Sequence, residues 1–163
     1  MLTPYHILPD DTRVWVYQAN RTLTQDEVWE ISDILENFAD RWQAHQQNVH
    51  GLASIYYRRF IVLMADESKC EISGCSIDSS VRLIKELEQA YQLNFFDRMK
   101  FCYKITSDMV GSFSVHQLPE LIESGKLKED TIVFNNLVAT KKDFETKWEI
   151  PFKESAYTRF ASA

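Results

Sequence analysis

The stretch that most constrains the fold of this chain runs from residue 60 to residue 91. It opens with six apolar residues, Phe60 to Ala65, continues through a polar loop, and reaches Gly74 and a group of small hydroxyl residues. Apolar residues then recur at spacings of three and four, from Val81 to Tyr91. The short apolar run predicts a buried strand, and the later spacing predicts a helix with one buried face. We therefore expect a strand, a glycine turn and a helix in direct succession.

The rest of the chain alternates strand and helix patterns at short spacing. Strands are predicted at 13–20, 99–105, 112–115 and 131–138, and within 52–65 either as a hairpin or as one strand bent around Arg58 and Arg59. Helices are predicted at 25–45, near 119–125, and after Thr140 as far as Pro151. These connections are too short for parallel crossovers throughout, so we expect an α+β sandwich. It has a mixed, mostly antiparallel sheet with helices packed mainly on one face.

Length and composition indicate one domain. The 163 residues are 45% hydrophobic, which is enough for one core and too little chain for two ordinary domains. We expect a single domain over 1–163, with a leading segment at 1–11 on the surface and a docked C-terminal tail at 152–163. In that tail, Tyr157 and Phe160 should pack on the body of the protein.

Charge and cysteine usage exclude several classes of function. The net charge of −6 and the lack of basic runs argue against nucleic-acid binding. No apolar stretch is long enough to span a membrane, and residues 1–11 do not resemble a signal peptide. Three cysteines without a Cys-x-x-Cys pair favour a reduced, cytoplasmic setting. The spacing of Cys70 and Cys75, and of His45 and His50, matches no zinc pattern, so we expect no metal and no cofactor.

The best candidate site is the start of the helix that follows Gly74. Unpaired amide groups converge at a helix N-terminus, and the helix dipole there favours a thiolate or a bound anion. Cys75 and Asp78 are the hypothetical catalytic residues, with His116 or His45 as a base if folding brings one near. The hypothetical binding residues are Gly74, Ser76, Ser79, Ser80, Arg13, Arg21, Asn135 and Asn136. The alternative is a buried cysteine at a tight turn, with Ser76 or Asp78 capping the helix.

Three further features allow both a functional and a structural interpretation. Arg13, Arg21, Arg58 and Arg59 would form an anion site if they gathered near Gly74, although arginines more often solvate a strand edge. Asn135 and Asn136 would read a polar ligand at a strand end, but such amides commonly bond their own turn. Trp29 falls outside the apolar stripe of its predicted helix, which indicates an exposed contact for a partner or a second copy.

Four segments carry a resemblance to a known family. They are residues 13–21 (RVWVYQANR), 74–81 (GCSIDSSV), 132–138 (IVFNNLV) and 148–151 (WEIP). In these the chain resembles a family of short bacterial proteins that are often labelled "ABC transporter ATPase", and the resemblance covers nearly the whole length. It implies a soluble single domain.

The residues themselves do not support the activity in that label. A phosphate-binding loop needs two glycines five apart, followed by Lys and Ser or Thr. Only Gly125-Lys126 has the required dipeptide, but Glu120 stands where the first glycine should be and Leu127 follows the lysine. We therefore expect that the chain is not an ATPase of the ABC-transporter type.

Two hypotheses about function remain. The first is a non-catalytic binding or interaction module that recognises a protein or a small anionic ligand at the 74–80 helix start, with possible self-association as a homodimer through exposed aromatic residues. The second is a small thiol-dependent enzyme that uses Cys75 with Asp78. The absence of an adjacent base, a metal-binding pattern or a phosphate loop favours the first.

Overall fold

The computed structural model describes residues 4–44, 47–68 and 71–161, and its fold is α+β, as predicted. The helices are α1 (Gln25–Arg41), α2 (Gly74–Tyr91), α3 (Leu118–Glu123) and α4 (Lys141–Lys147). The strands are β1 (Arg13–Gln18), β2 (Gln43–Ala44), β3 (Gln47–Asn48), β4 (His50–Tyr56), β5 (Phe60–Asp66), β6 (Lys100–Lys104), β7 (Val110–Ser114), β8 (Ile132–Phe134) and β9 (Glu149–Pro151). Short 3₁₀ helices lie at η1 (Tyr5–Ile7), η2 (Val115–Gln117), η3 (Phe152–Glu154) and η4 (Ala156–Phe160).

The apolar run at residue 60 forms the central strand of the first sheet. The strand order is β1-β5-β4, and both pairings are antiparallel. Every residue of β5 except Asp66 is buried. A strand that is flanked on both edges and covered on both faces must be apolar throughout, which explains the unbroken run.

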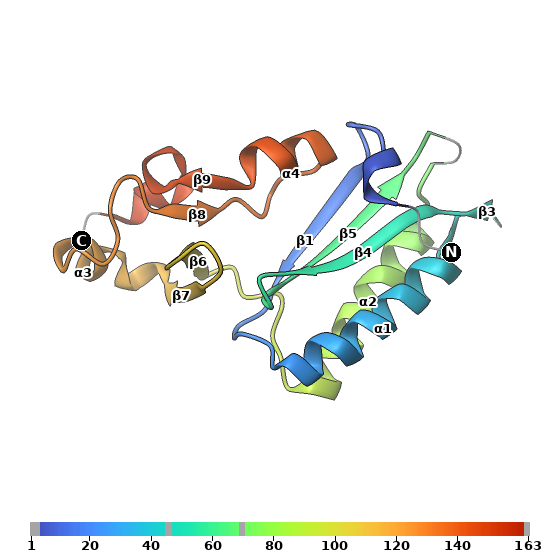
Figure 1. Ribbon diagram of the computed structural model, residues 1–163, viewed down its shortest axis with the longest axis horizontal. Coiled ribbons are helices and arrows are strands. Elements are labelled where there is room, and N and C mark those ends of the chain that lie inside the picture. The colour runs from blue at the N-terminus through green and yellow to red at the C-terminus, as the bar shows by residue number, and fades with distance from the viewer. Residues whose placement is uncertain (1–3, 45–46, 69–70, 162–163) are drawn as a thin grey trace.

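The helices α1 and α2 cover one face of this sheet (Figure 1). Ile61 and Leu63 of β5 point to this side and pack with Ile31, Leu35 and Ile84 of the two helices. Ile31 and Leu35 lie four residues apart on α1, which is the helical repeat, whereas Ile61 and Leu63 alternate along the strand. This layer confirms that both predicted helices have one buried face.

The C-terminal part of the chain covers the other face. Phe60, Val62 and Met64 pack there with a buried group that includes Phe134 and Trp148. The connection between β8 and α4 also runs along β1, where the Val14 amide donates to the Ala139 carbonyl over 2.9 Å. The first sheet is therefore enclosed between the α1–α2 layer and the residues around β8 and α4.

The remaining strands form a second antiparallel sheet in the order β7-β6-β8-β9 (Figure 1). Phe101 and Val133 of this sheet pack with Leu118 of α3 and Phe152 of η3 in a separate core. The expected docking of the tail is confirmed as far as residue 161, because Tyr157 and Phe160 pack on this core. The strands are thus divided between two larger sheets and the short β2–β3 pair, where one sheet was expected.

The β4–β5 connection is a hairpin, which was one of the two alternatives for residues 52–65. Tyr57 and Arg58 both have positive φ angles, of 55° and 53°, in the left-handed region that normally favours glycine. The Tyr57 hydroxyl donates to Glu149 of β9 over 2.9 Å, and Lys104 of β6 pairs with the same carboxylate. The strained turn therefore carries Tyr57 into contact with the second sheet.

Several predicted boundaries were wrong for local reasons. α1 ends at Arg41 because Trp42 is extended, so the 25–45 helix is shorter than expected. The leading segment is not simply laid on the surface, since Leu8 is buried against Val14. The strand predicted at 112–115 is β7, which already begins at Val110 and includes Gly111.

The C-terminal boundaries also differ from those predicted. β8 ends at Phe134, because the two asparagines that follow form a turn. α4 ends at Lys147, and Pro151 lies in strand β9.

Candidate functional site

The predicted helix after residue 74 begins at Gly74, one residue before Cys75. Ser73 is its N-cap, and the Ser73 hydroxyl accepts a hydrogen bond from the Ser76 amide over 3.1 Å. The structural alternative, in which Ser76 or Asp78 caps the helix, was wrong, because the cap is Ser73. Cys75 lies inside the first turn. Cys75 is exposed, so this thiol is accessible to solvent.

The hydroxyl groups near Cys75 bond to the helix itself. The Ser79 hydroxyl donates to the Ser76 carbonyl over 2.7 Å, and the Ser80 hydroxyl donates to the Ile77 carbonyl over 2.6 Å. Ser76 and Ser80 are buried, whereas Asp78 is exposed. These hydroxyls therefore serve the helix backbone, and they form no cluster pointing at one ligand position.

The first two predicted arginines lie at opposite ends of α2. Arg13 pairs with Glu67 at 3.3 Å, and the same carboxylate oxygen accepts from the Ile72 amide in the loop before α2. Arg21 instead forms a bidentate pair with Glu27 over two distances of 2.8 Å. It also donates to the carbonyl of the last residue of α2.

The other two arginines hold the strained hairpin turn in place. Arg58 donates to the Leu23 carbonyl over 3.0 Å. Arg59 is only 5% exposed and donates to the Ala19 carbonyl and to the Ser112 hydroxyl of β7. The structure does not bring the four arginines together, and the described contacts of these two are structural.

The two asparagines separate into a turn residue and a bridging residue. The Asn135 side chain accepts from the Leu137 amide over 3.2 Å, as expected of an amide that bonds its own turn. The Asn136 side chain donates to Gln18 of β1 over 2.9 Å and accepts from the Trp148 indole over 2.9 Å. The turn interpretation thus describes Asn135, while Asn136 joins the first sheet to the residues after α4.

The candidate base for Cys75 is not near it in the described structure. His116 is exposed in η2, which lies with β7 and α3 at the opposite end of the molecule from the start of α2 (Figure 1). His45 and Cys70 lie outside the described residues. Burial raises the pKa of the Cys102 thiol to about 12, which makes that cysteine a poor nucleophile. Within the described ranges, no three His, Cys, Asp or Glu side chains are placed to hold a metal ion.

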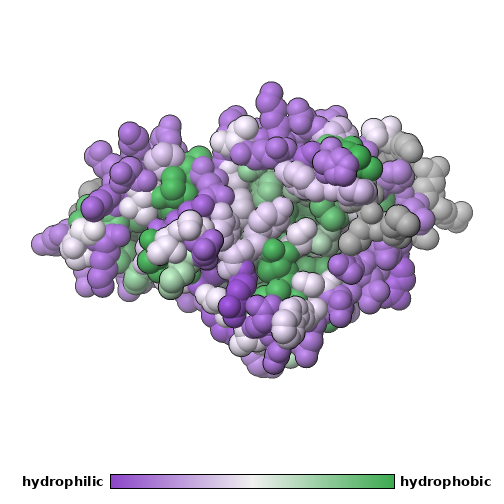
Figure 2. Space-filling model, viewed as in Figure 1, coloured by the Kyte–Doolittle hydropathy of each residue, from purple (hydrophilic) through white to green (hydrophobic). Residues whose placement is uncertain are grey.

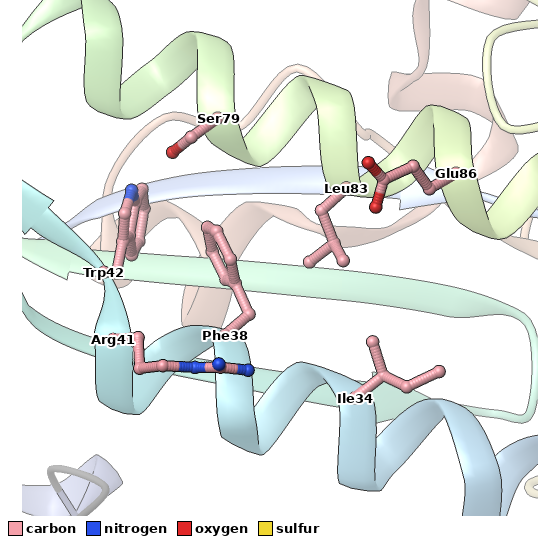
Figure 3. Close-up of a pocket in the computed structure, with 7 residues that line it drawn as sticks. All are labelled: Ile34, Phe38, Arg41, Trp42, Ser79, Leu83 and Glu86. Atoms are coloured by element: carbon pink, nitrogen blue, oxygen red, sulfur yellow. The ribbon is translucent and has the colours of Figure 1, made fainter.

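A hollow between α1 and α2 lies beside the first turn of α2 and was not predicted. Its volume is about 390 Å³, and we call it the α1–α2 groove. It is lined by Ile34, Phe38, Arg41, Trp42, Ser79, Leu83 and Glu86 (Figure 3). Ser79 is the only one of these residues that was among the predicted binding residues.

The groove has an apolar centre and polar ends. Phe38 of α1 and Leu83 of α2 point toward one another across it, with Ile34 beside them (Figure 3). At one end the Trp42 indole donates to the carbonyl of Ser76 over 2.9 Å, which fixes the end of α1 to the first turn of α2. The groove therefore starts where the sequence placed its candidate site.

The sequence carried a weak signal for this groove. Ile34 and Phe38 lie four residues apart on α1 and form a second apolar strip next to the core strip, whereas α2 contributes the single Leu83 beside the core residue Ile84. All three side chains are partly buried. The core stripe alone was read from the sequence, and the two helices had to be placed side by side before the second strip formed a groove.

A second hollow of about 290 Å³ lies along the edge of β1. It is bordered by residues 13–17 and 136–139, and Leu137 beside it is 88% exposed. The Val14 amide at this edge already donates its hydrogen bond to the Ala139 carbonyl. The chain thus protects part of its own edge strand, which limits pairing with another strand.

Comparison with known proteins adds no assignment. The chain matches no family model, and no curated protein or solved structure matches it. None of the helices in the described ranges is both long and apolar enough to cross a lipid bilayer.

Proposed function

We propose that this protein is a non-catalytic binding module and that the α1–α2 groove is its recognition surface. The observation that carries the proposal is the pair Phe38 and Leu83, which face one another on the outer side of the helical layer while each remains partly exposed. Apolar side chains in a concave surface gain free energy when a partner covers them.

A protein segment is favoured over a small anion as the partner. The Ser73 hydroxyl occupies the Ser76 amide, and the Ser79 and Ser80 hydroxyls donate to helix carbonyls, so the start of α2 offers few free donors to an anion. The groove presents apolar surface along two helices instead. That surface suits an apolar side chain from a partner protein.

The test uses a neutral amphipathic peptide of leucine and serine, about four helical turns long, as the probe. We expect its addition to shift the amide NMR signals of α1 and α2 around Phe38 and Leu83. Leu83→Gln should weaken binding about tenfold, because one leucine side chain no longer buries its surface. The matched control is Ile105→Gln in the β6–β7 hairpin, where Ile105 is already exposed, and it should bind normally. Shifts spread over the whole surface, or equal binding by both variants, would contradict the proposal.

The alternative is a thiol-dependent enzyme, which one observation favours. Cys75 is exposed in the first turn of an 18-residue helix, so a substrate can reach this thiol from solvent. Reaction with iodoacetamide across the neutral pH range would separate the two functions. A thiol that reacts no faster in the folded protein than in urea supports the binding module, and a reaction about tenfold faster supports the enzyme.

A further inference from the structure

We infer that the α1–α2 groove binds an amphipathic helix of a partner protein, with an acidic side chain at the Arg41 end and a basic side chain at the Glu86 end. This inference rests on the proposed function and names the chemistry of the partner. It follows from the hydrogen bonds of the residues that line the groove, from the two charged residues among them, and from the positions of those two charges.

The uncharged polar groups that line the groove already donate their protons within the fold. The Trp42 indole and the Ser79 hydroxyl both donate to the Ser76 carbonyl, over 2.9 Å and 2.7 Å. The centre of the groove, at Phe38 and Leu83, is apolar and attracts no particular polar group. The polar groups of a partner are therefore selected mainly by the charged residues of the lining.

The two charged residues of the lining are Arg41 and Glu86. Both are exposed, and neither forms an ion pair with any described residue. Arg41 donates only through Nε, to the Asn37 carbonyl over 3.3 Å, which uses one of the five N–H donors of a guanidinium. A carboxylate of a partner can therefore still bind Arg41, and a basic side chain of the partner can bind Glu86.

These two charges lie at opposite ends of the groove. α1 and α2 run antiparallel, and the Trp42 indole that follows α1 bonds to Ser76 in the first turn of α2 (Figure 1). Arg41 is the last residue of α1, whereas Glu86 lies ten residues beyond Ser76, about 15 Å along α2. In Figure 3, Arg41 lies beside Trp42, and Glu86 lies at the other end. A bound segment therefore meets one positive and one negative group, and these fix its orientation.

The shape of the groove favours a helix over an extended strand. The lining runs over residues 34–41 of α1 and 79–86 of α2, which is about 10 Å along each helix. Two to three turns of a third helix cover that length with apolar residues at every third or fourth position. A helix also bonds its own backbone groups, for which the apolar centre of the groove offers no partners.

The test uses three peptides of about four helical turns that share a strip of leucines. The first has glutamate near its N-terminus and lysine about three turns later, the second has these two residues exchanged, and the third has serine at both positions. Because the first two have the same net charge, general attraction to an acidic protein is equal for both. Binding to the full chain is measured by calorimetry and located by amide NMR shifts. We expect both charged peptides to bind in the groove about fivefold more tightly than the serine peptide, with a smaller advantage at high salt.

A nitroxide label at the peptide N-terminus reports the orientation, because it broadens the amide signals near it. The first peptide should broaden signals at the Arg41 end and the second at the Glu86 end, since each turns its glutamate toward the guanidinium. The variant Arg41→Glu with Glu86→Arg keeps the net charge and should reverse both results. The matched control, Lys126→Glu with Glu129→Lys, exchanges two exposed charges outside the groove and should change neither.

The outcomes distinguish this inference from the function on which it rests. Equal or weaker binding of the charged peptides in the groove, or the same label position for both of them, overturns the charge pattern of the partner and leaves the binding module in place. A label position that the Arg41 and Glu86 exchange does not reverse has the same meaning. If the groove signals shift with protein concentration alone, a second copy covers the groove and the partner helix is overturned. If none of the three peptides shifts these signals, both the inference and the proposed function are overturned.

Discussion

Thr12 has a buried hydroxyl without a hydrogen-bond partner among the described residues. Thr12 is 1% exposed, and its side-chain oxygen has no hydrogen-bond partner among the described residues. Its backbone carbonyl, in contrast, accepts a hydrogen bond from the Lys141 amide over 2.8 Å. Such a group loses its hydration without compensation. We predict that Thr12→Val raises the free energy of unfolding by about 1 kcal/mol, measured by urea denaturation.

The matched control for this prediction is Thr140→Val. The Thr140 hydroxyl caps α4 by accepting from the Asp143 amide over 3.2 Å. The same change of side chain should therefore lower stability there by about 1 kcal/mol. A loss of stability in both variants would show that the Thr12 hydroxyl does have a partner in solution.

At the residue scale, the hairpin turn shows what the sequence could not reveal. Consecutive positive φ angles in a hairpin turn are normally signalled by Asn-Gly or Asp-Gly, but in this three-residue connection they belong to Tyr57 and Arg58. Their long-range contacts hold the backbone in its strained form, since Arg58 donates to Leu23 and Tyr57 to Glu149. A propensity argument cannot see contacts between residues more than thirty positions apart.

At the scale of elements, α1 begins with a capping box. Thr24 and Glu27 bond each other's backbone amides, and Arg21 forms its bidentate pair with the same glutamate. The hydrogen bond from Arg21 is the main reason that the pKa of Glu27 is lowered to about 2.

This lowered pKa makes the start of α1 sensitive to acid. A carboxylate with a depressed pKa in the folded state stabilises the fold above its ordinary pKa and loses that effect as pH falls toward the folded value. We predict that Arg21→Gln lowers the melting temperature most near neutral pH. The gap between variant and parent should narrow between about pH 5 and pH 2.

The control is Arg82→Gln, an exposed arginine on α2 for which the described residues provide no ion pair. Its small effect should not change with pH over the same range. Part of the Arg21 effect should persist in acid, because this guanidinium also donates to the Tyr91 carbonyl over 2.9 Å. A gap that stays constant from neutral to acidic pH would contradict the assigned pair.

The start of α2 illustrates how far element prediction reached. The periodicity from Val81 to Tyr91 correctly gave a helix, and the hydroxyl-rich segment correctly gave its beginning. The sequence offers several residues that can cap a helix, and only the backbone geometry selects Ser73, whose φ and ψ are those of an extended residue. The sequence therefore placed these hydroxyl groups correctly at the start of the helix, but their hydrogen bonds are made to the helix itself and not to a ligand.

At the scale of the whole molecule, Asn136 links the two halves of the fold. It bridges Gln18 and the Trp148 indole, and Gln18 in turn donates to the Lys100 carbonyl of β6 over 3.3 Å. We predict one cooperative unfolding transition, with coincident far-ultraviolet and near-ultraviolet circular dichroism. Asn136→Ala should shift both signals together and cost about 2 kcal/mol, because two partners lose their bond.

The control is Asn135→Ala, which removes a solvent-exposed turn bond of a partly buried side chain and should cost less than about 1 kcal/mol. Two separate transitions in the parent protein would contradict the single domain expected over residues 1–163. A shift of only one signal in the Asn136 variant would show that the bridge stabilises one sheet alone.

The division into two sheets could not be read from the sequence. Each strand is recognisable by its apolar or alternating residues, but strand order depends on pairings between distant segments, such as β1 with β5. Two strands of the second sheet, β8 and β9, have only three residues each, which is too few to give a periodicity. The groove was hidden for the same reason, because its two walls come from helices far apart in the chain.

The enclosure of the first sheet has a consequence for synthesis on the ribosome. The side of the sheet that carries Phe60, Val62 and Met64 is covered by Phe134 and Trp148. These two residues leave the ribosome only when most of the chain has been synthesised. Until then the nascent protein exposes a hydrophobic sheet surface, to which chaperones that recognise exposed apolar segments can bind. Translation speed through the last third of the message should therefore influence how much of the product aggregates.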